Sequence, residues 1–144
     1  MCTFQRKQHF NDAASVELVC ELFLRTATDY DIEVIAYCFM PDHLHALITG
    51  LVEQSNCRKC ADVFRQKSGF HFRRARRTRL WQDAYYDHVL RDEDATVDVV
   101  SYIVLNPVRG GLCADASAYP FLGSSRYELA QLLTATEWNP RPLG

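Results

Sequence analysis

The chain has 144 residues, of which 48% are hydrophobic and 24% charged, and its formal net charge is −2. This is the composition of one globular domain large enough to bury a core, and no apolar run approaches the roughly 20 residues that a membrane span needs. The first residues lack the apolar segment of a secretory signal, so we expect a cytoplasmic protein with no membrane partner and with reduced cysteines.

The N-terminal part of the sequence predicts a short strand followed by a helix. Residues 1–10 have strand-like content but form only a short run. Asn11 and Asp12 can cap a helix that extends to about Asp29, because their side-chain oxygens accept hydrogen bonds from the free N–H groups of a first turn. Apolar residues at helical spacing predict the buried face of this helix: Val16, Val19, Cys20, Phe23 and Ala27.

Two strands are expected after this helix. Residues 32–40 and 43–49 are rich in β-branched and aromatic side chains, and Pro41-Asp42 between them predicts a tight turn. The second strand begins with His43-Leu44-His45. Because side chains alternate between the two faces of a strand, both imidazoles project to the same face. That arrangement suits two ligands of one divalent metal ion.

The second half of the sequence predicts two more helices around one strand. We expect a helix over about 55–72 and then a strand over 80–91. A further helix should run from a cap at 92–94 to about Asn106, where Pro107 and Gly110-Gly111 stop it. The end of the chain is expected to be rich in loops. The element order β-α-β-β-α-β-α predicts an α+β fold, namely a single ferredoxin-like or RRM-like domain with helices packed on one face of an antiparallel sheet. We place this domain at residues 1–127 and a C-terminal tail at residues 128–144.

The low net charge hides a strongly basic segment. From Arg58 to Arg79 there are nine Lys or Arg residues and one acid, Asp62, so the window carries +8 and the remaining chain −10. Such a segment in an otherwise acidic protein is typical of contact with nucleic-acid phosphates, although a solvated, ion-paired helix face is the alternative. Phenylalanines in the window could stack on unpaired bases or belong to the core. The candidate nucleic-acid contacts are Arg65, Lys67, Arg73, Arg74, Arg76, Arg77 and Arg79.

Tyr102 and Asn106 form a second candidate pair. They lie four residues apart and therefore share one face of the predicted third helix. The phenol of Tyr102 could attack a phosphodiester, and the amide oxygen of Asn106 suits a hard cation. Taken alone, the pair is better explained by packing, because tyrosine is often half buried with its hydroxyl hydrogen-bonded.

Four segments together resemble a known family. His43-Leu44-His45 matches the HUH motif (His, bulky apolar residue, His) of single-tyrosine nucleases, and the wider set is similar to the REP-associated tyrosine transposases, relatives of single-tyrosine insertion-sequence transposases. The segments occur in the family's order and cover most of the chain from about residue 8 to residue 127. They are residues 40–45, 80–91, 102–112 and 119–127.

The resemblance implies a specific chemistry. In this family two histidines and an Asn or Gln one helical turn after the tyrosine hold Mg²⁺ or Mn²⁺, which here implies His43, His45 and Asn106 as ligands. Tyr102 is implied as the nucleophile, preferred over the rival Tyr85, Tyr86 and Tyr127. Its attack leaves a 5′-phosphotyrosine link and a free 3′-hydroxyl, and attack by a second 3′-hydroxyl rejoins strands. The implied partner is single-stranded DNA folded into a REP-like palindromic hairpin, bound by a monomer or a homodimer.

Two further positions and one departure from the family affect this interpretation. Asp42 either orients a neighbouring histidine or serves only as a turn residue. Asp87-His88 resembles a recurrent pair of the family, but a structural hydrogen bond is favoured over a catalytic role for His88. The family begins with a full central strand, for which only residues 2–6 are available here, so we expect a shortened strand. The alternative function is therefore a non-catalytic, domesticated or decaying relative that binds DNA hairpins; a metal hydrolase that uses water is a weaker one.

Overall fold

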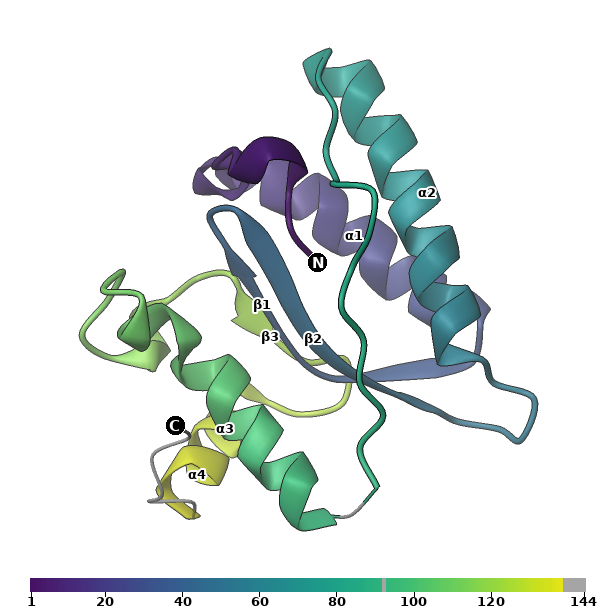
Figure 1. The fold of residues 1–144 in the computed structure, drawn as a ribbon. Helices are drawn as coiled ribbons and strands as arrows, with labels where there is room; N and C mark the ends of the chain where they lie inside the picture. Colours follow the sequence, from purple (N-terminus) through teal and green to yellow (C-terminus); the bar gives the residue numbers. More distant parts are fainter. Residues whose placement is uncertain (92, 139–144) are drawn as a thin grey trace.

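A computed structural model describes residues 1–91 and 93–138 of the chain. Within these residues an antiparallel sheet of order β2-β1-β3 lies between two pairs of helices (Figure 1). The strands are β1 (Ile32–Met40), β2 (His43–Gly50) and β3 (Leu122–Gly123). The helices are α1 (Ala13–Asp29), α2 (Cys57–Arg76), α3 (Glu93–Arg109) and α4 (Leu129–Trp138), with short 3-10 turns η1 (Phe4–Arg6), η2 (His9–Asn11) and η3 (Ala116–Ala118). The predicted α+β class with an antiparallel sheet is confirmed.

The helices cover both faces of the sheet, whereas the sequence predicted one covered face. α1 and α2 pack on one face, and α3 and α4 on the other (Figure 1). A bulge between Val34 and Ala36 changes the alternation of β1. Beyond it, Phe39 joins the core under α1 and α2, while Cys38 and Met40 join the core under α3. A central strand that is apolar on both sides has to be covered on both, which places α3 opposite α1.

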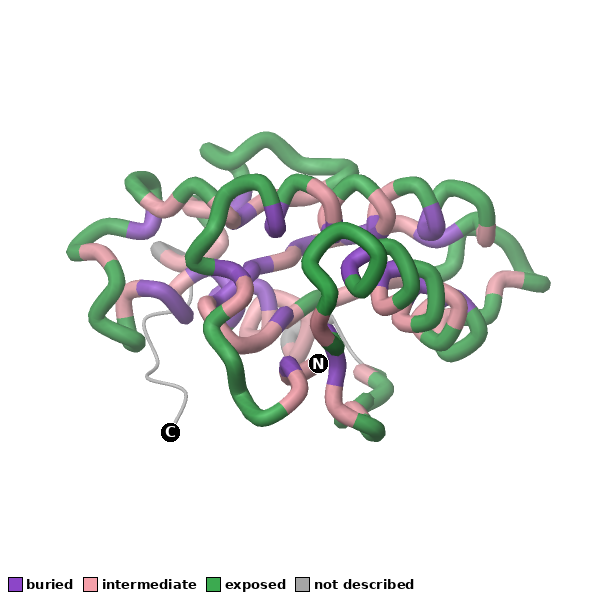
Figure 2. The backbone as a smooth tube through the Cα atoms, turned by 90° about the horizontal axis from the view of Figure 1, so that it is seen from above, coloured by how far each residue is buried: buried purple, intermediate pink, exposed green. Residues whose placement is uncertain are grey.

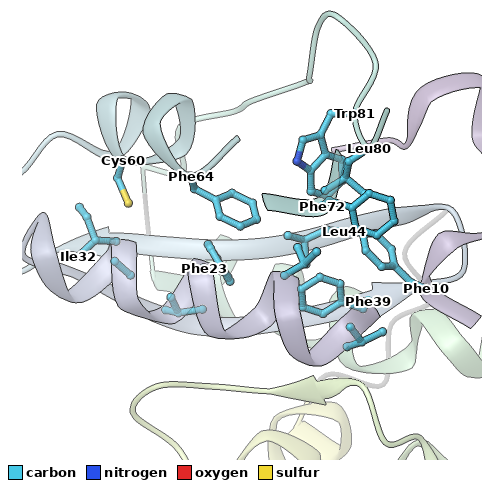
Figure 3. Packing of buried hydrophobic residues seen from close by; sticks show 14 residues of the cluster. Phe10, Phe23, Ile32, Phe39, Leu44, Cys60, Phe64, Phe72, Leu80 and Trp81 are labelled. Carbon is cyan, nitrogen blue, oxygen red and sulfur yellow. The ribbon is translucent and has the colours of Figure 1, made fainter. Parts of the chain in front are cut away.

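The core beneath α1 and α2 is rich in aromatic rings. The rings of Phe10 and Phe39 lie 5.1 Å apart between centroids, and those of Phe23 and Phe64 4.9 Å apart (Figure 3). The indole N–H of Trp81 donates a buried hydrogen bond of 2.8 Å to the Ser68 hydroxyl, which ties residue 81 to α2. Buried residues concentrate between the layers, while the turns and the outer helix faces are exposed (Figure 2).

The strand predicted over residues 80–91 is wrong, since this segment pairs only through an isolated bridge between Thr3 and Trp81. On its other side the N-terminal segment bridges Cys2 to His43, and the Leu44 N–H donates to the Met1 carbonyl at 2.8 Å. Residues 1–3 therefore lie where a strand would join β2 to the Trp81 segment. The short N-terminal strand expected from the sequence is reduced to these bridges, which leaves residues 82–91 without a ladder to extend.

The C-terminal part contains more helix than predicted. α3 continues through Pro107 to Arg109: the proline removes its own backbone hydrogen bond, but the pattern resumes after it, since the Gly110 N–H donates to the Asn106 carbonyl at 2.9 Å. α4 forms within the stretch expected to be a loop-rich tail, and its Leu132 is 2% exposed in the core under α3. The structure does not describe Asp92 of the predicted cap, the side chains of residues 93 and 94, or residues 139–144 of the predicted tail. None of the described helices is both long and apolar enough to cross a membrane.

Candidate active site

His43 and His45 lie on one face of β2, as the alternation of strand side chains predicts. They pair across the sheet with Met40 and Cys38, whose side chains belong to the core under α3. Their ring centroids are 4.8 Å apart. Leu44 between them is 4% exposed and packs in the opposite core. The apolar residue of the motif thus anchors the strand while the two imidazoles face α3.

α3 places Tyr102 against His45, and Asn106 lies one helical turn further along the same helix. The Tyr102 ring lies 5.8 Å from that of His45 between centroids and is partly open to solvent, whereas Asn106 is 8% exposed. The end of α3 lies close to β1, since a Cβ built at Gly110 would lie 2.9 Å from the Met40 Cε atom, the end of a flexible side chain. The predicted grouping of the histidine pair with the tyrosine helix is therefore present in the fold.

The Asn106 side chain has unused hydrogen-bonding capacity. Its Nδ2 atom is buried and finds no partner among the described residues. Turning the amide by 180° exchanges nitrogen and oxygen, and the oxygen in that position would be an acceptor that a divalent cation satisfies. No group of three or more His, Cys, Asp or Glu side chains in the described part of the chain is placed to hold a metal. A third protein ligand beside the histidines would therefore be this amide, and two imidazoles with one amide oxygen fit a divalent ion.

Asp42 contacts both His43 and Arg6. Its Oδ1 lies 2.6 Å from the His43 Nδ1, and its Oδ2 accepts a hydrogen bond of 2.9 Å from the Arg6 Nε. Burial opposes ionisation of Asp42, but the bonds from His43 and Arg6 outweigh it and lower the pKa of the carboxyl. An ionised Asp42 accepts a hydrogen bond from the Nδ1–H of His43, which leaves the Nε2 lone pair free to bind a ligand. Arg6 was not predicted, since nothing in its spacing links it to a residue 36 positions away.

Arg109 is a second residue that the sequence analysis missed. Its guanidinium carbon lies 3.9 Å from the centroid of the Tyr102 ring, and its Nη2 donates to the Tyr102 carbonyl at 2.7 Å. The signal was available, because residues 102, 106 and 109 form one stripe of a helix. A fixed cation beside the phenol favours negative charge at this point of the site.

His45 is held in its neutral form. Burial lowers the pKa of His45 to about 4, and the positive charges of His43, the N-terminal amino group, Arg109 and Arg6 act in the same direction. Neutral imidazole carries the lone pair that binds a metal, so this environment keeps His45 ready to act as a ligand at neutral pH.

The depressed pKa of His45 predicts a loss of stability in acid. Below about pH 6.5 the unfolded chain binds a proton at His45 while the folded chain does not, so stability is complete above pH 6.5 and falls until about pH 4. We expect this group alone to remove about 3 kcal/mol of unfolding free energy over that range. Urea unfolding of the metal-free protein at pH 7 and pH 4.5 measures the loss, and His45→Gln should show a smaller one. Equal losses in both proteins would contradict the assignment.

The structure divides the seven predicted nucleic-acid contacts into two groups. Three of them hold the fold: Arg65 donates to the Gln82 carbonyl, Arg76 pairs with Asp12, and Arg79 pairs with Asp83 while lying over the Phe4 ring. The other four are exposed and form no ion pair with any described residue; they are Lys67, Arg73, Arg74 and Arg77. These four are free to contact phosphates.

Other predicted positions lie apart from this cluster. His88 is exposed and makes none of the ring contacts that join the two histidines to Tyr102 within the described residues. Among the rival tyrosines, Tyr85 donates its hydroxyl to Asp62, Tyr86 is 87% exposed, and Tyr127 lies beside Arg126. Tyr102 is thus the tyrosine whose ring contacts the histidine pair.

An antiparallel α+β domain that brings a His-x-His pair to a tyrosine on the facing helix has the architecture of a single-tyrosine transposase. The family model for IS200-like transposases matches residues 1–106, and the chain belongs to this family. The resemblance stated from the four sequence segments is confirmed.

Curated relatives and a solved structure agree with this assignment. The chain is 24% identical over 127 residues to a REP-associated tyrosine transposase of Escherichia coli, covering 85% of this chain and 72% of that protein. It is 24% identical over 136 residues to a Haemophilus influenzae protein provisionally given the same name, covering 83% and 74%. A solved structure of a REP-associated tyrosine transposase bound to a REP hairpin superposes on this chain with a TM-score of 0.70. The match covers 84% of this chain and 72% of that one at 21% identity, which shows a shared fold.

Proposed function

We propose that this protein is a metal-dependent transposase that cleaves and rejoins single-stranded hairpin DNA through a phosphotyrosine intermediate. The observation that carries the proposal is the single cluster in which His45 contacts both His43 and Tyr102, with Asn106 one turn further along α3. Membership of the IS200-like family supports the reaction class. The names of the relatives support a hairpin of the REP type as the substrate.

His43, His45 and Asn106 would hold the divalent ion, Mg²⁺ or Mn²⁺. When bound, such an ion supplies Lewis-acid stabilisation of negative charge on the scissile phosphate. The protein's contribution is to keep the ligands in the correct state. Asp42 directs the Nε2 lone pair of His43 outward, burial keeps His45 neutral, and the unpartnered amide of Asn106 supplies the third contact.

Tyr102 would act as the nucleophile. Its phenolic oxygen forms a bond to phosphorus, the bond from phosphorus to the 3′-oxygen breaks, and the leaving oxygen takes up a proton while the phenol loses one. The product is a 5′-phosphotyrosine link with a free 3′-hydroxyl. Because the new ester conserves the energy of the old one, a second 3′-hydroxyl can reverse the step and rejoin strands. The Arg109 guanidinium beside the ring stabilises the phenolate when it leaves.

The DNA would extend from α2 to α3. Three of the four free cations lie on α2 and the fourth, Arg77, follows its last residue; α2 covers one face of the sheet, and Tyr102 lies on α3, which covers the other. A bound hairpin would therefore pass an edge of the sheet, with phosphates of its hairpin part at α2 and its single-stranded foot at Tyr102. Affinity for the stem should fall steeply with salt, because phosphate contacts release counterions.

The proposal is tested by trapping the intermediate. We expect purified protein with Mn²⁺ and a labelled REP-like hairpin to give a covalent protein–DNA adduct on a denaturing gel, and no adduct when Mn²⁺ is chelated. Hairpin binding without an adduct under several metals would favour the non-catalytic alternative. Absence of both binding and adduct would overturn the proposal.

Loss of the Asp42 contact should weaken metal binding without removing a ligand. We expect Asp42→Ala to lower Mn²⁺ affinity about 10- to 100-fold, the usual cost of losing a group that orients a ligand, and Asp42→Asn to retain part of it through its amide oxygen. Free Mn²⁺ measured by electron paramagnetic resonance checks this without DNA. Glu53→Gln, at an exposed carboxylate in the loop after β2, is the matched control. Wild-type affinity in Asp42→Ala would show that Asp42 is only a turn residue.

A further inference from the structure

Phe70 is an aromatic side chain that the fold does not bury. Of the three phenylalanines in α2, Phe64 and Phe72 are each 1% exposed in the core, whereas Phe70 is 59% exposed. Arg74 lies over its ring at 5.7 Å from the centroid. A single exposed apolar ring is ordinary on a protein surface, so what distinguishes Phe70 is its position among cations that form no ion pair with any described residue.

A groove borders this ring along α2. Its volume is about 680 Å³, and it lies between α2 and the segment from Arg79 to Trp81. Phe70 and Arg73 line it, and the same two residues also line a smaller hollow of about 300 Å³ with Arg74 and Arg77. The ring therefore stands between two hollows, with a free arginine shared by both.

Gly69 is unusual at the edge of this groove. A glycine inside a helix costs stability relative to alanine, yet no close contact requires it here. A Cβ at position 69 would meet only the Trp81 Cδ1 atom, at an ordinary distance of 3.9 Å. The missing side chain keeps the groove open beside Phe70, and packing alone gives no reason for it.

We infer that this groove binds an unpaired nucleotide of the DNA, with its base stacked on Phe70 and its phosphate held by Arg73. Planar bases stack on aromatic rings independently of sequence, and flanking cations neutralise the adjoining phosphates. The inference rests on the proposed function, since it deepens the description of the DNA substrate. It adds a binding element on α2, on the face of the sheet opposite Tyr102, that recognises a base and not only backbone charge.

The test compares a hairpin containing unpaired nucleotides with a fully paired linear duplex of equal length, using fluorescence anisotropy. We expect Phe70→Ala to weaken hairpin binding about 5- to 100-fold and to leave duplex binding within about twofold. A 2-aminopurine base scanned through the unpaired positions should change fluorescence on binding to wild type at one position, and this change should be lost in Phe70→Ala. Phe70→Leu, which keeps an apolar side chain without a planar ring, should behave like Phe70→Ala.

A second variant separates binding from folding. Gly69→Leu fills the groove and should melt at or above the wild-type temperature, because leucine has a higher helix propensity than glycine. The same variant should bind the hairpin as weakly as Phe70→Ala does. Ala75→Leu, exposed on the same helix away from the groove, should bind as wild type. Hairpin affinity unchanged by both Phe70→Ala and Gly69→Leu would overturn the inference. The proposed function would still stand if wild type forms the adduct, and both fail if wild type neither binds nor reacts.

Discussion

Tyr102→Phe should abolish the covalent adduct while leaving hairpin binding within about twofold of wild type. The change removes one oxygen atom and keeps the ring that packs against His45 and lies beneath Arg109. Without that oxygen no bond to phosphorus can form, so the adduct should fall to the detection limit; removing the nucleophile of a serine protease lowers kcat by about 10⁶-fold. A denaturing gel with a labelled hairpin measures the adduct, and anisotropy measures binding.

Two other tyrosines provide matched controls for this substitution. Tyr85→Phe and Tyr127→Phe remove the same atom from rings that do not contact the histidine pair. Both variants should form the adduct at the wild-type level. An adduct that persists in Tyr102→Phe and disappears in one of the controls would show that the nucleophile had been assigned to the wrong residue. An adduct that survives all three changes would exclude these tyrosines as the attachment point.

The parts of the site that could be predicted are those set by local periodicity. The alternation of a strand places His43 and His45 on one face, and one helical turn relates Tyr102 to Asn106. Neither pattern required knowledge of the tertiary fold. Arg109 follows the same helical spacing and could have been included. The class of fold was predictable for the same reason, because α1, β1, β2 and α2 each have a clear period and clear ends.

The parts that could not be predicted depend on contacts between distant segments. Arg6 reaches Asp42 only because the N-terminal segment lies beside the β1–β2 turn. Residues 80–91 have the composition of a strand but lack a neighbouring strand long enough to pair with, and composition does not report the partner. The basic window looked uniform in sequence, yet three of its arginines are used within the fold. Phe70 could be distinguished from Phe64 and Phe72 only by its exposure.

Asn106→Leu should have opposite effects on stability and on metal binding. In the metal-free protein the buried Nδ2 of Asn106 has no partner among the described residues, and an unsatisfied buried polar group costs about 1–3 kcal/mol. Leucine has a similar size and no polar atom, so we expect the metal-free variant to be more stable than wild type by about 1 kcal/mol. The same change removes the oxygen ligand, so Mn²⁺ should no longer raise the melting temperature as it does for wild type.

Thermal unfolding with and without Mn²⁺ measures both effects in one experiment. His45→Ala is the informative comparison, because it also removes a ligand but creates a cavity, so it should lose the Mn²⁺ response and lose stability as well. A packing role for Asn106 predicts the reverse pattern, in which Asn106→Leu is destabilised and keeps the Mn²⁺ response. A residue whose removal stabilises the empty protein and abolishes its response to the metal is retained for the ligand, since the fold alone is better served without it.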